Sequence, residues 1–217
     1  MLTLKNLTVK AGDKTILKNL NFHFEKGKVY VIMGPNGSGK STLIRAIIGD
    51  RSLSIQGKIL FASKNISHLP PEKVAALGIY ASFQNPPAID GVTIYQFFFS
   101  FFGAKYDILE TKDKIDRIAN ALAIKQELLD RPMNVKFSGG EKKKLEVLQA
   151  LLINPKLIIF DEIDSGVDAE SLKLIFTNLK KFQTKDKTFI FITHYEKIFD
   201  YLQPDVILTI KNGVITR

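Results

Sequence analysis

A glycine-rich run followed by a lysine and a serine is the feature of this sequence with the clearest chemical potential. The run is Gly34-Pro35-Asn36-Gly37-Ser38-Gly39-Lys40-Ser41-Thr42, which fits the pattern G-x-x-x-x-G-K-[ST] between a predicted strand at 28–33 and a predicted helix at 40–48. Glycines let backbone N–H groups wrap around phosphate oxygens, and the start of a helix adds the positive end of its dipole. We expect Lys40 to reach the β- and γ-phosphates of a nucleotide and Ser41 to bind Mg²⁺. The alternative, an incidental glycine-rich turn, is disfavoured because a strand and a helix flank the run on the required sides.

Two adjacent carboxylates follow an apolar run later in the chain. The run Leu157-Ile158-Ile159-Phe160 is typical of a buried strand, and Asp161-Glu162 come directly after it. The carboxyl end of such a strand can bring both acids to the phosphate loop. We expect Asp161 to join the Mg²⁺ shell and Glu162 to orient or deprotonate an attacking water. Acidic residues often end strands, so this pattern indicates a nucleotide site only in combination with the phosphate loop.

A serine and two glycines precede another predicted helix. In Phe137-Ser138-Gly139-Gly140-Glu141, a hydroxyl and free backbone N–H groups stand at the start of a helix predicted over 141–152, which favours a second anion site. An ordinary N-cap at Ser138 explains the same residues. Taken alone, the run leaves both interpretations open.

The arrangement of elements predicts an α/β fold. Strands and helices alternate through the second half of the chain, which predicts a parallel sheet covered on both faces, in a mixed sheet core. The N-terminal strands favour an antiparallel β region, and helical spacing from about 93 to 130 predicts an inserted, mostly helical lobe. The predicted strands are 2–9, 16–24, 28–33, 57–62, 79–83, 157–160, 188–193 and 206–210, and the other predicted helices are 71–77, 169–182 and one ending near 202.

Composition excludes several kinds of chemistry. The 217 residues include no cysteine, which excludes disulfides, thiolate zinc sites, cysteine nucleophiles and iron–sulfur clusters ligated by this chain's own thiolates. Thirty-one Lys and Arg against 22 Asp and Glu give a net charge of +9, which favours anionic partners such as nucleotides. A nucleic-acid partner is not expected, since no known binding module is recognisable. The apolar run 94–104 has about half of the roughly 20 residues that a membrane-spanning helix needs, so no direct membrane insertion is expected.

The order of the motifs resembles that of the ABC-type ATPases. After the phosphate loop come Gln84 at a strand end, Ser138-Gly139-Gly140-Glu141, Asp161-Glu162, Ser165-Gly166-Val167-Asp168 and Thr193-His194. The resemblance covers essentially the whole chain and implies a single ABC ATPase domain over 1–217. In that domain, 1–92 and 155–217 form the nucleotide-binding core, and about 93–154 form a helical lobe that carries the signature motif, Ser138-Gly139-Gly140-Glu141.

This resemblance implies Mg²⁺-dependent hydrolysis of ATP and a role for each motif. Two subunits pack head to tail as a homodimer or pseudo-dimer, and each ATP lies between one phosphate loop and the other subunit's Ser138-Gly139-Gly140. Gln84 contacts Mg²⁺ and the attacking water, His194 contacts the γ-phosphate and positions Glu162, and Asp168 crosses the dimer interface. Catalysis of this kind rests on positioning and charge stabilisation. One departure from transporter-type subunits is the lack of an aromatic residue in 9–13 that would stack on adenine.

Further peptides narrow the resemblance to the SufC-like subunits of the SUF iron–sulfur cluster assembly system. They are 71–73, 77–86, 89–92, Asn134 with 137–144, 161–166 and 193–195. The resemblance implies a cytoplasmic or plastid-stromal motor whose ATP-driven closure deforms scaffold proteins resembling SufB and SufD. It also implies that Asp164 pairs with a lysine after the signature, here Lys143, and we hypothesise that this pair holds Glu162 away from water. A solvated helix face at 142–144 is the alternative.

Two other functions are compatible with the same motifs. The ATPase subunit of an ABC membrane transporter would use the same catalytic residues, with the segment 97–102, five phenylalanines in six residues, receiving the permease. That segment is a candidate docking surface in either case, and core packing explains it equally well. A nucleotide-gated clamp that needs no turnover is disfavoured by Glu162, because a clamp has no use for a catalytic base.

Overall fold

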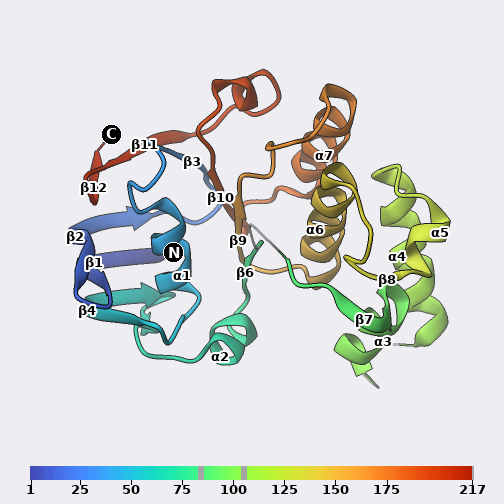
Figure 1. Cartoon of the computed structure of the whole chain (residues 1–217), viewed down its shortest axis with the longest axis horizontal. Helices are drawn as coiled ribbons and strands as arrows, with labels where there is room; N and C mark the ends of the chain where they lie inside the picture. Colours follow the sequence, from blue (N-terminus) through green and yellow to red (C-terminus); the bar gives the residue numbers. More distant parts are fainter. Residues whose placement is uncertain (83–85, 104–106, 217) are drawn as a thin grey trace. The chain divides into compact units, whose positions relative to one another are not determined.

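The computed structural model describes residues 1–82, 86–103 and 107–216, which form two compact units (Figure 1). Of these residues, the first unit holds 1–82, 155–164 and 183–216, and the second unit holds 86–154 and 165–182. The chain therefore leaves the first unit twice and returns to it twice.

A six-stranded sheet lies at the centre of the first unit, in the order β12-β11-β3-β10-β9-β6. Its strands are β3 (Val29–Met33), β6 (Ile79–Ala81), β9 (Leu157–Asp161), β10 (Thr188–Ile192), β11 (Val206–Lys211) and β12 (Val214–Thr216). β9 and β10 are buried at every residue, as parallel strands covered on both faces are, and this explains their continuous apolar sequences. β12 pairs antiparallel with β11 across the turn at Asn212-Gly213, where both residues have positive φ. The sheet is therefore mixed, as predicted.

The predicted antiparallel region forms a second sheet in the same unit, in the order β2-β1-β4-β5. Its strands are β1 (Leu2–Ala11), β2 (Lys14–Phe24), β4 (Leu53–Phe61) and β5 (Lys64–Asn65). The register between β1 and β4 shifts between Lys5 and Thr8. A side chain at Gly57 would begin 2.3 Å from the carbonyl oxygen of Asn6, so this crossing of two backbones requires glycine.

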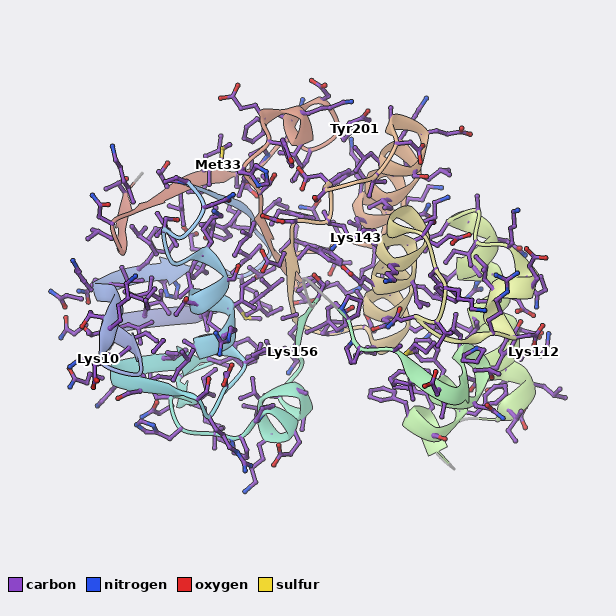
Figure 2. All side chains as sticks on the ribbon, viewed as in Figure 1. Lys10, Met33, Lys112, Lys143, Lys156 and Tyr201 are labelled. Carbon is purple, nitrogen blue, oxygen red and sulfur yellow. The ribbon has the colours of Figure 1, made fainter. Side chains whose placement is uncertain are left out.

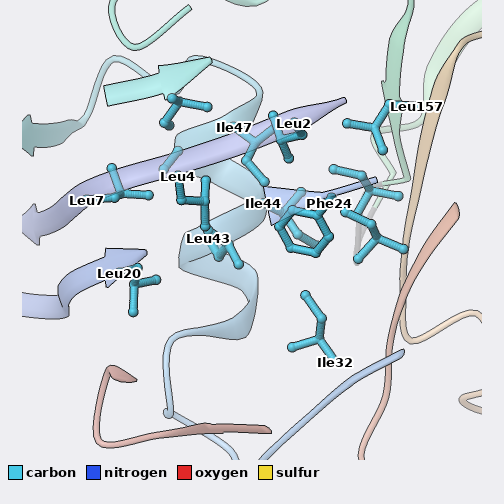
Figure 3. Close-up of a cluster of buried hydrophobic side chains, with 14 of the residues drawn as sticks. Leu2, Leu4, Leu7, Leu20, Phe24, Ile32, Leu43, Ile44, Ile47 and Leu157 are labelled. Carbon is cyan, nitrogen blue, oxygen red and sulfur yellow. The ribbon is translucent and has the colours of Figure 1, made fainter. Parts of the chain in front are cut away.

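The core of the first unit joins helix α1 (Lys40–Ile47) to both sheets (Figure 3). The rings of Phe24 and Tyr30 meet edge to face, with centroids 4.9 Å apart. The fully or nearly fully buried side chains around them include Leu2, Leu4, Ile32, Leu43, Ile44, Ile47 and Leu157. Helix α2 (Pro71–Ala76) adds Val74 to the same cluster. Because α1 is held on its apolar face, the phosphate loop at its N-terminus is anchored at one end.

The second unit is mostly helical, as predicted for the inserted lobe. Its helices are α3 (Ile94–Phe102), α4 (Ile108–Ala121), α5 (Gln126–Leu129), α6 (Gly139–Ile153) and α7 (Ala169–Phe182), with a small sheet of β7 (Ile89–Thr93) and β8 (Pro132–Met133). Thr93 and Asp107 begin α3 and α4 by accepting hydrogen bonds from backbone N–H groups of the first turn. Asn154 ends α6 in the left-handed conformation.

The structure differs from the sequence-based expectations in a few places. The last predicted helix is a short 3₁₀ segment, Glu196–Asp200. The sequence predicts that 165–182 belong to the nucleotide-binding core, whereas α7 packs against α6 and groups with the helical unit. None of the helices in the described ranges is both long and apolar enough to cross a membrane.

Candidate active site

Three neighbouring strands of the central sheet end at the same edge and bring the predicted catalytic segments together. β10 lies between β3 and β9, and all three are parallel, with Ile192 opposite both Ile32 and Asp161. The next residues cross-link the edge, since the Glu162 N–H donates to the Ile192 carbonyl at 2.9 Å and the Thr193 N–H donates to the Ile32 carbonyl at 3.2 Å. The carboxyl edge of a parallel sheet is where such folds bind ligands.

The phosphate loop follows β3, whose last residue, Met33, is labelled in Figure 2. The Lys40 ammonium lies inside the loop and donates to the carbonyls of Gly34 at 2.7 Å and Pro35 at 3.0 Å. Gly34 has φ 146°, and a side chain there would begin 2.2 Å from the carbonyl oxygen of Ile210. The loop is therefore wrapped around its lysine, at a position where only glycine fits.

The N-terminus of α1 offers donors to an anion. Gly39, the N-cap, has φ 111° and has no side chain with which to cap the first N–H groups of α1. The Ser38 hydroxyl is buried and has no hydrogen-bond partner among the described residues. Ser41 and Thr42 follow in the first turn, and both are half-buried. Free N–H groups at a helix start attract phosphate.

The two carboxylates after the β9 apolar run have different surroundings. Asp161, the last residue of β9, is only 4% exposed, and its N–H donates to the Ser82 hydroxyl at 3.0 Å. Glu162 takes a left-handed backbone conformation, with φ 53°. Its Oε1 lies 3.2 Å from Nδ1 of His194, although the two groups are not aligned as a hydrogen bond. Glu162 and His194 are thus close enough to act on one bound molecule.

A buried polar cluster lies behind these two residues. The Thr193 hydroxyl donates to Oδ2 of Asp164 at 2.6 Å and accepts from the Tyr195 N–H at 2.9 Å. Burial raises the pKa of Asp164, while the hydrogen bond from Thr193 opposes that rise. The rings of His194 and Tyr195 lie 3.8 Å apart. The turn that carries His194 is therefore held by side-chain as well as main-chain contacts.

The second unit carries the other predicted site residues. Ser138 forms a capping box, accepting from the Glu141 N–H at 3.3 Å and donating its own N–H to Glu141 at 2.8 Å. A side chain added at Gly140 would meet nothing within 4 Å, so its backbone is open to approach. Asp168 caps α7 by accepting from the Ser171 N–H at 2.8 Å, and this bond lowers the pKa of Asp168.

The two residues predicted to regulate the site have separate partners. Lys143, on α6 (Figure 2), lies 3.3 Å and 3.4 Å from the two carboxylate oxygens of Glu146. Both side chains are buried within the second unit. Asp164 belongs to the first unit and accepts from Thr193. A pair between Lys143 and Asp164 stays a prediction.

The sequence-predicted residues thus fall into two groups, and one lies outside the described residues. The first unit brings the phosphate loop, Asp161, Glu162 and His194 to one sheet edge. The second unit holds the signature residues, Lys143 and Asp168. Gln84 lies outside the described residues. Ser82 and the hydroxyl of Thr193 were missed as site-supporting groups, because nothing in the sequence indicates which backbone or carboxylate each would bind.

Comparison with known proteins identifies the family. Residues 17–165 match the family model described as ABC transporter. The probable ATP-dependent transporter ycf16 of Antithamnion sp. is 40% identical over 99% of this chain and 89% of its own length. The probable ATP-dependent transporter SufC of Escherichia coli strain K12 is 38% identical over 100% of this chain and 91% of its own length. A dimeric post-hydrolysis state of the ATP-binding cassette MJ0796, bound to ADP and Pi, aligns with a TM-score of 0.84 and 25% identity, covering 100% of this chain and 97% of that one.

The fold and the motifs agree with these comparisons. The mixed sheet, the antiparallel region and the helical unit carry the phosphate loop, the acid pair and the signature in the expected order. The family match extends over well over half of the chain, and the relatives align along nearly all of it. The chain belongs to the ABC transporter ATPase family and is an ATP-binding, ATP-hydrolysing cassette.

Proposed function

We propose that two copies of this chain, or this chain and a similar partner, bind ATP between them and hydrolyse it. The observation that carries the proposal is the meeting of the Lys40 loop, Glu162 and His194 at one sheet edge. The phosphate loop supplies free N–H groups and an ammonium to the triphosphate. Ser138-Gly139-Gly140 of the second copy covers the γ-phosphate from the other side, and Asp168 lies in the interface between the copies. The MJ0796 cassette, of which 97% aligns with this chain, forms a dimer bound to ADP and Pi.

The donor set of the loop and β9 fits Mg²⁺. This ion prefers oxygen ligands and is usually held by one or two protein groups together with substrate phosphates. The Ser41 hydroxyl in the first turn of α1 and the Asp161 carboxylate at the end of β9 are oxygen donors of that kind. We assign them, with Gln84, as the magnesium ligands. The bound ion neutralises negative charge on the β- and γ-phosphate oxygens.

We assign the hydrolytic step to Glu162 with His194. Glu162 orients the attacking water and accepts its proton as the water oxygen bonds to the γ-phosphorus and the ADP oxygen leaves. His194, 3.2 Å from Glu162, contacts the γ-phosphate and keeps the carboxylate in place. Lys40 exchanges its two loop carbonyls for phosphate oxygens, which are stronger acceptors for an ammonium.

Two substitutions test these roles. Glu162→Gln keeps the size of the side chain and removes the base, so we expect ATP turnover to fall by about 100-fold or more. With Mg·ATP, this variant should remain a dimer that size-exclusion chromatography detects. Lys40→Ala should abolish nucleotide binding measured by calorimetry. The exposed Lys64 on β5 provides the control, since Lys64→Ala should leave both properties unchanged. Parent-like turnover in Glu162→Gln or in Lys40→Ala contradicts the assignment.

Within the family, we place the chain with the SufC-like subunits that drive iron–sulfur cluster assembly. The residues that support this are the acid Asp164 two positions after Glu162 and the Glu-Lys-Lys-Lys run after the signature glycines. The similarity to the protein of Escherichia coli named SufC supports it further. Closure of the ATP-bound dimer then deforms scaffold proteins resembling SufB and SufD, in the cytoplasm or a plastid stroma. A change in the ion-pair partner of Lys143, from Glu146 to Asp164, would regulate this step. An unchanged basal ATPase rate in Lys143→Ala would exclude this regulation.

An exposed apolar surface on α3 and α4 is our proposed docking site for the scaffold. Phe98 is fully buried in the second unit, whereas Phe101 is 53% exposed, so the phenylalanine run serves the core and also reaches solvent. Ile108 and Leu109 at the start of α4 are 63% and 71% exposed. These side chains lie on two helices that contact each other, and exposed large apolar side chains are typical of protein interfaces. Phe101→Ser with Leu109→Ser should lose co-purification with SufB/SufD-like proteins and keep basal ATPase activity.

A membrane transporter subunit is the second candidate, favoured by the description of the matching family and by the word transporter in the names of both relatives. The catalytic roles are the same in both cases. Affinity purification of the tagged chain, followed by mass spectrometry, separates them. Recovery with non-membrane scaffold proteins supports the SufC-like function, and recovery with a membrane permease supports the transporter.

A further inference from the structure

The hydroxyl of Thr193 closes the turn that carries His194. Thr193 is fully buried and follows β10 directly. Its Oγ1 accepts from the Tyr195 N–H at 2.9 Å, a bond that spans the His194 backbone. The same oxygen donates its proton to Oδ2 of Asp164 at 2.6 Å. One hydroxyl therefore shapes the turn and ties it to the segment that begins with Glu162.

We propose that Thr193 is a positioning residue for hydrolysis, acting through His194, and this inference rests on the proposed role of His194. The main chain also joins the two segments, since the Glu162 N–H donates to the Ile192 carbonyl at 2.9 Å. That bond lies before the turn, so it does not fix the orientation of the His194 side chain. The Thr193 hydroxyl fixes the residues on both sides of His194, and so sets where its ring stands relative to Glu162.

The surroundings of the hydroxyl favour a fixed geometry over a mobile one. Asp164 is buried, and its other oxygen, Oδ1, receives no hydrogen bond from the described residues. Burial strengthens the hydrogen bond that this carboxylate accepts from Thr193, because the protein interior screens the interaction less than water does. His194 also packs on Tyr195, with ring centroids 3.8 Å apart, so the bond to the Tyr195 N–H sets that packing as well.

A second threonine in the same strand provides a matched control. Thr188 begins β10, is fully buried, and likewise uses its hydroxyl twice. It accepts from the Gly27 N–H at 3.1 Å and donates to the Glu25 carbonyl at 3.1 Å. Thr188 lies at the end of the strand away from the site. Thr188→Val and Thr193→Val thus remove equivalent hydroxyls, and only the second removes one beside His194.

The experiment measures steady-state ATPase kinetics of Thr193→Val, Thr193→Ser and Thr188→Val. Misplacement of a catalytic group by a fraction of an ångström lowers turnover, so we expect Thr193→Val to reduce kcat by about 10-fold or more with KM for ATP within about twofold of the parent. Thr193→Ser keeps the hydroxyl and should recover most of kcat. Thr188→Val should lower the thermal midpoint and retain the parent kcat. Equal kcat losses in both valine variants, or no recovery with serine, would overturn the proposal.

A double substitution separates this inference from the proposed function. If Thr193 acts through His194, Thr193→Val should cause no further loss of kcat in a His194→Ala chain. Additive losses would overturn the positioning role. A parent-like kcat in His194→Ala alone would instead refute the catalytic assignment of His194, and a large loss there with a parent-like Thr193→Val would refute this inference only.

Discussion

The backbone of Glu162 offers a direct test of strain at the catalytic position. Its φ of 53° places an L-residue with a long side chain in the left-handed region. The conformation turns the Glu162 N–H toward the Ile192 carbonyl, which accepts it at 2.9 Å. Residues held in this way at functional sites store energy that the surrounding structure must compensate. We therefore predict that Glu162→Gly stabilises the fold relative to Glu162→Ala.

The magnitude follows from two opposing effects. Left-handed backbone costs an L-residue roughly 1–2 kcal/mol, and glycine avoids this cost. Glycine also gives the unfolded chain more freedom, which reduces the benefit by about 0.4–1 kcal/mol. The difference leaves about 1 kcal/mol in favour of glycine, which for a chain of this size corresponds to about 2–4 °C in thermal midpoint. Both variants lack the carboxylate, so the comparison cancels its burial and its contact with His194.

Differential scanning calorimetry of the two variants without nucleotide measures this difference. Ala75, exposed on α2, provides the control for glycine itself. Its backbone is helical, so Ala75→Gly should lower stability by about 0.5–1 kcal/mol, the opposite sign. Both position-162 variants should lack ATP turnover. A Glu162→Gly chain that melts at or below the temperature of Glu162→Ala would refute the idea that this position is strained.

Three further outcomes are expected. Gly34→Ala forces a side chain to within 2.2 Å of the Ile210 carbonyl oxygen at φ 146°, so it should lose the stabilisation of the chain by Mg·ATP in a thermal shift assay. Burial raises the pKa of Asp164 above its ordinary 3.8, so ionising this carboxyl destabilises the fold as pH rises from 3.8 through the raised pKa. At pH 7, Asp164→Asn should therefore resist urea unfolding better than the parent, by a margin that shrinks toward pH 4. Phe24→Ala removes a fully buried ring that packs on Tyr30 and should cost about 3–5 kcal/mol of unfolding free energy, with parent-like ATP affinity in the folded fraction.

Much of the fold could be predicted because its strands are chemically distinct. The buried runs of β3, β9 and β10 have no polar interruption, as central parallel strands require, and the helices after them have clear apolar faces. The two-residue strands β5 and β8 could not be predicted, because so short a pairing leaves no apolar pattern, and the partner of β8 lies far earlier in the chain. The sequence predicts a longer helix where the 3₁₀ segment Glu196–Asp200 lies, because the apolar spacing there fits both structures.

The site was predictable in its residues more than in its contacts. The phosphate loop carries its own signal, since glycine, lysine and serine spacing reflects local backbone geometry. The contact of Lys143 with Glu146, three positions along one helix, was not predicted, and the pairing of Lys143 with Asp164 stays a prediction. The left-handed turn at Glu162 was missed as well, because nothing in an apolar–Asp–Glu run favours positive φ. Such features are set by neighbours in space.

The strand order explains why these neighbours matter for catalysis. Along the chain, β3 precedes the phosphate loop, β9 precedes Glu162, and β10, which precedes His194, comes last of the three. In the sheet, however, β10 lies between β3 and β9. His194 therefore emerges between the phosphate loop and the catalytic acid, within reach of both. The two hydrogen bonds of the Thr193 hydroxyl hold the turn that follows β10, which makes this turn the element whose geometry controls hydrolysis.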